Sequence, residues 1–115
     1  MARTRRPRRD SAVLILASYP RRLAAERAAS LLVRERVFAC ATVLPGAQAF
    51  YMWKGKRHAE TSALLHGKTT RARAGDAVRR LRETHPDEVP EILVFDITGG
   101  DPDYLAWLAG EVKGP

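Results

Sequence analysis

Two extended segments that flank the tripeptide Lys54-Gly55-Lys56 constrain the fold of this chain more than any other feature. The first begins near residue 38 and continues through residues 50–53 (FYMW), and the second returns over residues 57–68, where side chains alternate along the segment. A period of two is typical of a strand, and a glycine between two such segments provides the turn of a hairpin. Both arms exceed the length of about five to six residues that is usual for strands. We therefore expect a long hairpin that contacts more than one packing partner.

The segments before the hairpin predict a strand, a helix and the start of the first hairpin arm. Residues 12–17 form a continuous apolar run rich in Val, Ile and Leu, which is typical of a buried strand. Residues 20–36 repeat apolar side chains at helical spacing. Residues 38–44 return to an extended pattern that Pro45-Gly46 interrupts. Because proline cannot donate to a central ladder, we expect a bend or bulge at this point.

The segments after the hairpin predict a second helix, a strand and a short terminal helix. Thr69 or Thr70 is a candidate N-cap, and the His-Pro pair at residues 85–86 ends the helix that follows. Residues 92–95 (ILVF) form another buried-strand run. Residues 99–102 (GGDP) combine a turn, an aspartate N-cap and a proline suited to the first turn of a helix.

The order of these elements is strand, helix, strand, strand, helix, strand, with a terminal helix appended. This order predicts an α+β fold of the ferredoxin-like split βαβ type (βαββαβ), with an extended hairpin and a short C-terminal helix. In that fold both long helices cover one face of an antiparallel sheet. Because the predicted strands are apolar on both sides, the other face also needs a cover, and we expect another subunit to provide it.

The positive charge of the chain is concentrated at its N-terminus. The formal net charge is +7, and residues 1–10 contribute five arginines and one aspartate, so residues 11–115 carry 7 − 4 = +3. We predict a basic, disordered arm over residues 1–10, because it lacks the apolar side chains that would offset the entropy of ordering it. Residues 11–115 then form a single domain. The arm is interpreted as a solvated terminus, or as a weak contact for nucleic acid or another anionic surface.

Several classes of protein are disfavoured by missing signatures. No segment reaches the ~18 apolar residues of a membrane span. A single cysteine, with nothing that points to export, favours a reducing cytosol. Neither a glycine-rich phosphate loop nor a nucleophile elbow is present, so we expect no enzyme. RNA-recognition domains share the predicted element order, but their aromatic and glycine signature is missing here, which leaves RNA binding a distant alternative.

Five ordered motifs resemble those of the CutA proteins, a family linked to divalent-cation tolerance, and the resemblance spans residues 11–112. The motifs are ACATVLPG (residues 39–46), YMWKGK (51–56) with Glu60 following, Lys68-Thr69, His85-Pro86 with VPEI (89–92), and DYLAWL (103–108). The resemblance implies a ferredoxin-like homotrimer whose sheets pack around the three-fold axis. It also implies binding of a divalent metal, copper in particular, near the hairpin and the subunit boundary.

The same resemblance supplies the candidate site residues. Carried over by position, His85, Glu60 and Cys40 are the candidate metal ligands. Four further residues are expected to line the cleft: Trp53, Lys68, Tyr51 and Asp87. Asp87 departs from the family pattern, which commonly has tyrosine after His-Pro, so a carboxylate replaces an aromatic wall of the cleft.

The residue types leave simpler interpretations open for three of these positions. A free cysteine in an apolar strand, such as Cys40, usually behaves as a small hydrophobic residue. His85 could interact with a helix C-terminus, and Glu60 could pair with Lys68. His58, near the turn, fits a surface position.

Metal specificity does not follow from spacing alone. No paired Cys or His spacing marks a zinc site. Imidazole, thiolate and carboxylate ligands favour Cu²⁺ over the other first-row divalent ions, so copper is the cation that we expect. A structural or signalling trimer with an indirect metal link is the alternative function.

Overall fold

The computed structural model describes residues 8–114 of the chain. Within this range the chain forms four strands and three helices. In chain order they are β1 (Ala12–Tyr19), α1 (Arg22–Arg34), β2 (Cys40–Trp53), β3 (Lys56–Thr70), α2 (Arg71–Thr84), β4 (Ile92–Asp96) and α3 (Pro102–Glu111). This is the predicted element order. Most of the predicted N-terminal arm, residues 1–7, lies outside the described residues, whereas the backbone N–H of Ala72 in α2 donates to the Arg9 carbonyl at 2.9 Å.

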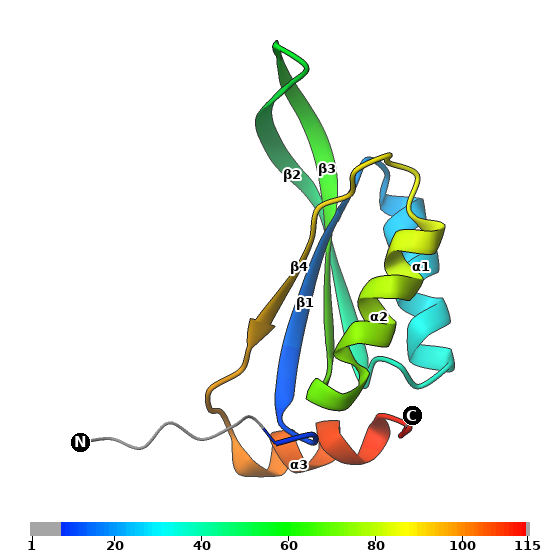
Figure 1. Ribbon diagram of the computed structural model, residues 1–115, viewed down its shortest axis with the longest axis vertical. Coiled ribbons are helices and arrows are strands. Elements are labelled where there is room, and N and C mark those ends of the chain that lie inside the picture. The colour runs from blue at the N-terminus through cyan, green and yellow to red at the C-terminus, as the bar shows by residue number, and fades with distance from the viewer. Residues whose placement is uncertain (1–7, 115) are drawn as a thin grey trace, which may run out of the picture.

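The four strands form one antiparallel sheet in the order β2-β3-β1-β4. Figure 1 shows α1 and α2 side by side on one face of this sheet. The prediction of a ferredoxin-like α+β fold is therefore confirmed. The core lies between these helices and the sheet, and its largest members are Tyr19, Phe38, Ile15, Leu32, Leu65, Leu81 and Val13.

The hairpin extends well beyond the rest of the sheet (Figure 1). Its pairing shifts register between Leu44, which faces Leu64, and Ala47, which faces Ser62, so the irregularity predicted for the Pro-Gly pair is present. At the tip, Lys54 and Gly55 have φ angles of 51° and 77°. Two successive positive φ angles are characteristic of the type I′ turn, whose twist matches that of the flanking strands.

The two predicted helix N-caps differ in outcome. Asp101 caps α3 as predicted, because its carboxylate accepts the backbone N–H of Tyr104 at 2.8 Å. Thr70 occupies the N-cap position of α2, but its side chain makes no capping hydrogen bond. The neighbouring Thr69 is fully buried, and its hydroxyl donates to the Val37 carbonyl at 2.6 Å. Thr69 thus joins β3 to the segment that follows α1.

The face of the sheet opposite α1 and α2 is only partly covered. The α3 helix packs at one end of it, where Leu108 is fully buried outside the main core and the Tyr104 hydroxyl lies 3.2 Å from Cys40 Sγ. Leu93 and Phe95 of β4 each remain 46% exposed. In the single chain, β4 is therefore not the buried strand that its apolar run predicted. From the sequence we expected another subunit to cover this face. In the structure, α3 provides part of the cover.

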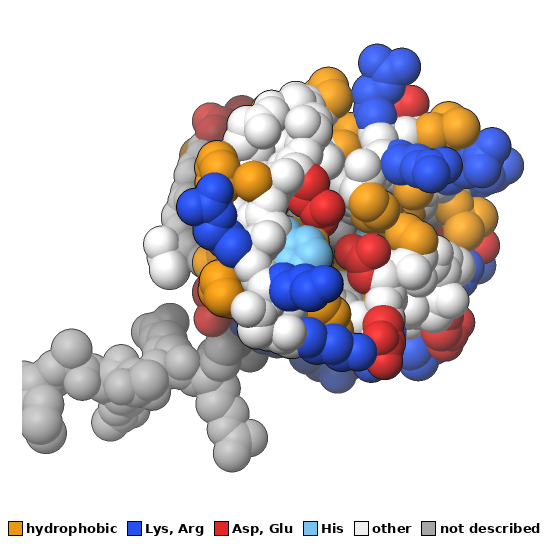
Figure 2. Space-filling model, turned by 90° about the horizontal axis from the view of Figure 1, so that it is seen from above, with side chains coloured by type: hydrophobic (Ala, Val, Ile, Leu, Met, Phe, Trp, Pro, Cys, Tyr) orange, Lys and Arg blue, Asp and Glu red, His pale blue; other side chains and the backbone are white. Residues whose placement is uncertain are grey.

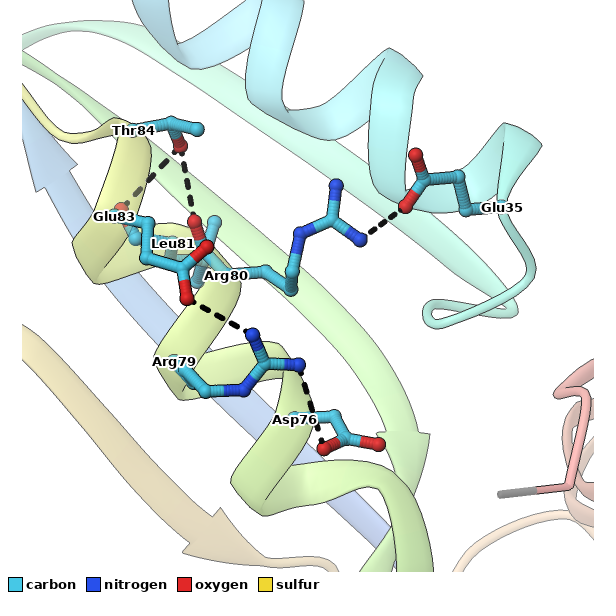
Figure 3. Close-up of polar contacts among 7 residues, drawn as sticks. All are labelled: Glu35, Asp76, Arg79, Arg80, Leu81, Glu83 and Thr84. Atoms are coloured by element: carbon cyan, nitrogen blue, oxygen red, sulfur yellow. Dashed lines mark hydrogen bonds and ion pairs between the residues drawn. The ribbon is translucent and has the colours of Figure 1, made fainter.

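Among the described residues, one ion pair joins the two long helices, and others occupy an arginine within α2. Figure 3 shows Arg80 of α2 reaching Glu35 at the end of α1, while Arg79 binds Asp76 and Glu83 within α2. The Arg79–Glu83 contact measures 2.9 Å. These pairs neutralise much of the basic charge on the helices, which weakens the case for a nucleic-acid surface there.

The Glu35–Arg80 pair predicts an acid-dependent loss of stability. The hydrogen bond from Arg80 holds the pKa of Glu35 below its ordinary value of 4.5. A carboxyl group whose pKa is depressed by folding stabilises the protein fully above its unfolded pKa, and this contribution disappears as the pH falls through the folded pKa. We expect Glu35→Gln to lower the urea midpoint at pH 7 and to have no effect at pH 2.5. An equal loss at both pH values would contradict this assignment.

Candidate functional site

The main cavity among the described residues is a cleft of ≈ 570 Å³ beside the hairpin. One wall is the hairpin, the opposite wall is the loop that joins α2 to β4, and the end of β1 lies between them. This volume is within the usual range of small-molecule sites, about 300–1,000 Å³. The side chains of interest in its lining are Tyr19, Phe50, Tyr51, Trp53, Glu60, Asp87, Glu88 and Glu91.

The cleft is acidic although the chain is basic. Its lining contains four carboxylates and, among the described residues, neither lysine nor arginine, whereas the whole chain has a formal charge of +7. Figure 2 views this end of the molecule from above and shows acidic and hydrophobic side chains across the middle of the face, with a histidine and Lys or Arg side chains beside them. A cavity lined by charges of one sign raises the local concentration of ions of the other sign. The site is therefore suited to a cation.

Two of the carboxylates approach the same tyrosine. The Tyr51 hydroxyl donates a hydrogen bond to Glu60 Oε1, and the Tyr51 ring stacks on His58 with 5.0 Å between centroids. The hydrogen bond to Glu60 raises the pKa of Tyr51, and the charge of Asp87 contributes in the same direction. Glu60 comes from the hairpin and Asp87 from the opposite loop, so the two carboxylates belong to opposite walls of the cleft. His58, interpreted from the sequence as a surface residue, supports this arrangement.

His85 lies beneath the cleft, and both of its ring nitrogens form hydrogen bonds with backbone groups. Its side chain is fully buried, and its ring stacks on Tyr19 with 4.2 Å between centroids. Nε2 lies 2.7 Å from the Ser18 carbonyl, while Nδ1 accepts the backbone N–H of Asp87 at 3.0 Å. Because a carbonyl can only accept, Nε2 carries the proton. Both nitrogens are thus occupied in the single chain, and His85 positions the loop that carries Asp87.

The Tyr19 hydroxyl is a buried polar group without a hydrogen-bond partner in the part of the chain that the structure describes. Tyr19 is 1% exposed and lines the cleft, and its Oη makes no hydrogen bond to any of residues 8–114. Burial raises the pKa of Tyr19 to about 12. At neutral pH the group is therefore an uncharged hydroxyl that can both donate and accept. Buried hydroxyls are normally hydrogen-bonded in native proteins, so this exception requires an explanation.

Cys40 and Lys68 lie at the other end of the hairpin. They face each other across β2 and β3, with 3.6 Å between Lys68 Nζ and Cys40 Sγ. The hydrogen bond with Cys40 and partial burial raise the pKa of Tyr104 to about 12. Glu60 lies eight residues from Lys68 on β3, which corresponds to about 26 Å along an extended strand. Cys40 and Lys68 therefore do not line the cleft of the single chain.

The structure divides the seven candidate residues into three groups. Tyr51, Trp53, Glu60 and Asp87 line one cleft, His85 is buried beneath it, and Cys40 with Lys68 is remote. Among residues 8–114 of one chain, no group of three or more His, Cys, Asp or Glu side chains could hold a metal ion. The set of His85, Glu60 and Cys40 thus does not converge within one chain. Glu88 and Glu91, which flank the Val-Pro pair after His85, were not among the candidates.

Comparison with known proteins identifies the family. The sequence profile of the CutA1 divalent ion tolerance protein matches residues 13–111. The chain belongs to the CutA1 family. It is 39% identical over 104 residues to the divalent-cation tolerance protein CutA of Pectobacterium atrosepticum, a match that covers 89% of this chain and 93% of that protein.

Crystal structures of CutA1-family proteins share the fold. CutA from Xylella fastidiosa is 35% identical to this chain and superposes with a TM-score of 0.86, covering 90% of this chain and 99% of that one. The divalent cation tolerance protein of Thermus thermophilus is 32% identical, with a TM-score of 0.84 and coverage of 89% and 99%. None of the helices within residues 8–114 has the length and apolar character that crossing a bilayer requires.

Proposed function

We propose that this CutA1-family chain acts in divalent-cation tolerance as a homotrimer that binds a divalent cation, Cu²⁺ in the first instance, in the acidic cleft. The observation that carries the proposal is the cleft lined by four carboxylates in a chain of net positive charge. Among the described residues, neither lysine nor arginine lines this cleft, although the chain contains 20 of them. The names of the chain's relatives point to the same class of ion. The proposed role is binding without catalysis.

The proposed ligands are two carboxylates from opposite walls of the cleft. Glu60 keeps the ligand role that the family resemblance implied, and Asp87 joins it from the opposite wall. His85 acts through Asp87, because it holds the backbone of the Asp87 loop. Cu²⁺ has the highest affinity among the first-row divalent ions for a given set of ligands. Cys40 is a free thiol outside this cleft, and a reducing cytosol remains our prediction for its compartment.

The uncovered part of the sheet supports the trimer. Leu93 and Phe95 are paired with Leu16 and Leu14 of β1, so these four apolar side chains share the face that α1 and α2 do not cover. Large exposed apolar surfaces of this kind mark interaction sites, since leaving them in water is unfavourable. A second and third copy of the chain would bury them.

Titration of Cu²⁺ into the full chain tests the metal site. We expect calorimetry in a non-chelating buffer to show saturable binding of Cu²⁺. Glu60→Gln and Asp87→Asn should each lower the affinity about tenfold or more, because even residues that only hydrogen-bond to metal ligands contribute that much. Cys40→Ser is the matched control and should leave the affinity unchanged. Unaltered affinity in the Glu60→Gln, Asp87→Asn double variant would refute this site. An indirect metal link in a structural or signalling trimer would then be the better account.

A further inference from the structure

The cleft contains features that a bare metal ion would not use. Tyr51 and Trp53, which share one face of β2, form an aromatic wall along the hairpin. Phe50 also lines the cleft and is 74% exposed. A hydrated divalent cation gains little from such a surface. An apolar or aromatic ligand would remove it from water, which is favourable in proportion to the area buried.

The aromatic wall already contacts a cation from this chain. The ammonium group of Lys54 lies 5.7 Å from the centroid of the Trp53 ring. This distance is within the range of cation–π attraction, in which the negative face of the ring stabilises a positive charge. Trp53 therefore has a ring face that an organic cation can approach.

The unpaired Tyr19 hydroxyl provides an independent indication of a ligand. Tyr19 belongs to the lining of the cleft, and its hydroxyl is buried and has no hydrogen-bond partner among the described residues. A primary ammonium or guanidinium group could donate a hydrogen bond to its oxygen. Such a group would also bind Glu60 and Asp87 by charge-assisted hydrogen bonds.

We infer that the cleft binds an organic cation, a primary ammonium or guanidinium group carried on an aromatic or apolar body. The charged group binds between Glu60 and Asp87 and donates to the Tyr19 hydroxyl, while the body packs against the aromatic wall. The inference goes beyond metal binding and stands on the lining of the cleft alone. The ligand is therefore recognised by charge at one end and by apolar contact at the other.

Phenethylammonium, with its neutral analogue 2-phenylethanol, tests this inference on the full chain. The two molecules share an aromatic body and differ in the charged group. We expect calorimetry or ligand-observed NMR at pH 7 to give affinity at least about tenfold higher for the cation, since a charge-assisted hydrogen bond contributes about that much. The preference should diminish as salt is added. Equal binding of the two molecules, or no binding of either, would overturn the inference.

Substitutions of cleft residues test whether phenethylammonium binds in the cleft. Glu60→Gln and Asp87→Asn should each weaken phenethylammonium binding about tenfold while 2-phenylethanol is unaffected. Tyr19→Phe removes only the hydroxyl, so it should lower the affinity for phenethylammonium severalfold. The melting temperature of the free protein should stay the same or rise, because an unpaired buried hydroxyl is removed. Glu26→Gln, on the exposed side of α1, is the control and should change nothing. Cation affinity that survives the Glu60→Gln, Asp87→Asn double variant would refute this location.

The results for metal and for organic cation are separable. Cu²⁺ binding without phenethylammonium binding would overturn this inference and leave the proposed function intact. Phenethylammonium binding without Cu²⁺ binding would support the inference and refute the metal site. The variants are therefore titrated with both probes.

Discussion

Replacing Gly67 with alanine is expected to lower the free energy of unfolding by about 1–3 kcal/mol, the usual cost of overpacking a core. Gly67 is buried in β3, and a Cβ added to it would lie 2.3 Å from Cζ of Phe38. That ring is itself 1% exposed, so neither group can move without disturbing the core. Urea unfolding at a fixed protein concentration measures the loss, because the stability of an oligomer depends on concentration.

Two further variants make this prediction specific. Phe38→Leu removes the ring that the new methyl group would meet, so the Gly67→Ala, Phe38→Leu double variant should lose less stability than the sum of the single variants. Gly75→Ala is the matched control, because nothing lies within 4 Å of a Cβ at this helical position. It should stabilise the protein by about 0.5–1 kcal/mol through helix propensity. Strict additivity of the Gly67 and Phe38 variants would contradict the steric explanation.

Replacing Leu93 with aspartate is expected to dissociate the proposed trimer. Leu93 is 46% exposed in the single chain and lies on the face of the sheet that α1 and α2 leave free. If three copies bury this face, an aspartate there places an unpaired charge in an apolar interface, which is strongly unfavourable. Sedimentation equilibrium at micromolar concentration should give three times 12.8 kDa, about 38 kDa, for the natural chain. The variant should sediment as a monomer or unfold.

The control for assembly is an exposed leucine on the other side of the molecule. Leu23 of α1 is 55% exposed, and Leu23→Asp should leave the sedimentation mass unchanged. A monomeric mass for the natural chain would refute the trimer outright. Loss of assembly in both variants would show that the effect is general and not due to the sheet face.

The hairpin shows how far local sequence reasoning reaches. The register shift at the Pro-Gly pair and the turn at Gly55 were both predictable, because each depends on the backbone chemistry of one or two residues. The order of strands and helices follows from hydrophobic periodicity within short windows, and periodicity is also a local property. The same local reasoning could not show that the β4 side chains are exposed in one chain, because an apolar run is compatible with burial by either the chain itself or a partner.

The composition of the candidate site could not be predicted without the fold. Glu60 and Cys40 belong to one hairpin, and only their pairing positions reveal that they lie near opposite ends of it. His85 is a plausible ligand by residue type, but the backbone groups of Ser18 and Asp87 occupy both of its nitrogens. One of those groups is 67 residues away in the sequence. No local pattern encodes such a contact.

The sequence by itself determined the element order, the long hairpin with its bulge and turn, and the membership of the CutA1 family, because these features depend on residue patterns that are read along the chain. Only the tertiary structure decided which polar groups share a cleft. Glu60 and Asp87 line its opposite walls, the Tyr19 hydroxyl has no hydrogen-bond partner within residues 8–114, and Cys40 is remote. The physical reason is that a binding site is defined by distances between segments, and those distances are set by packing of the whole domain.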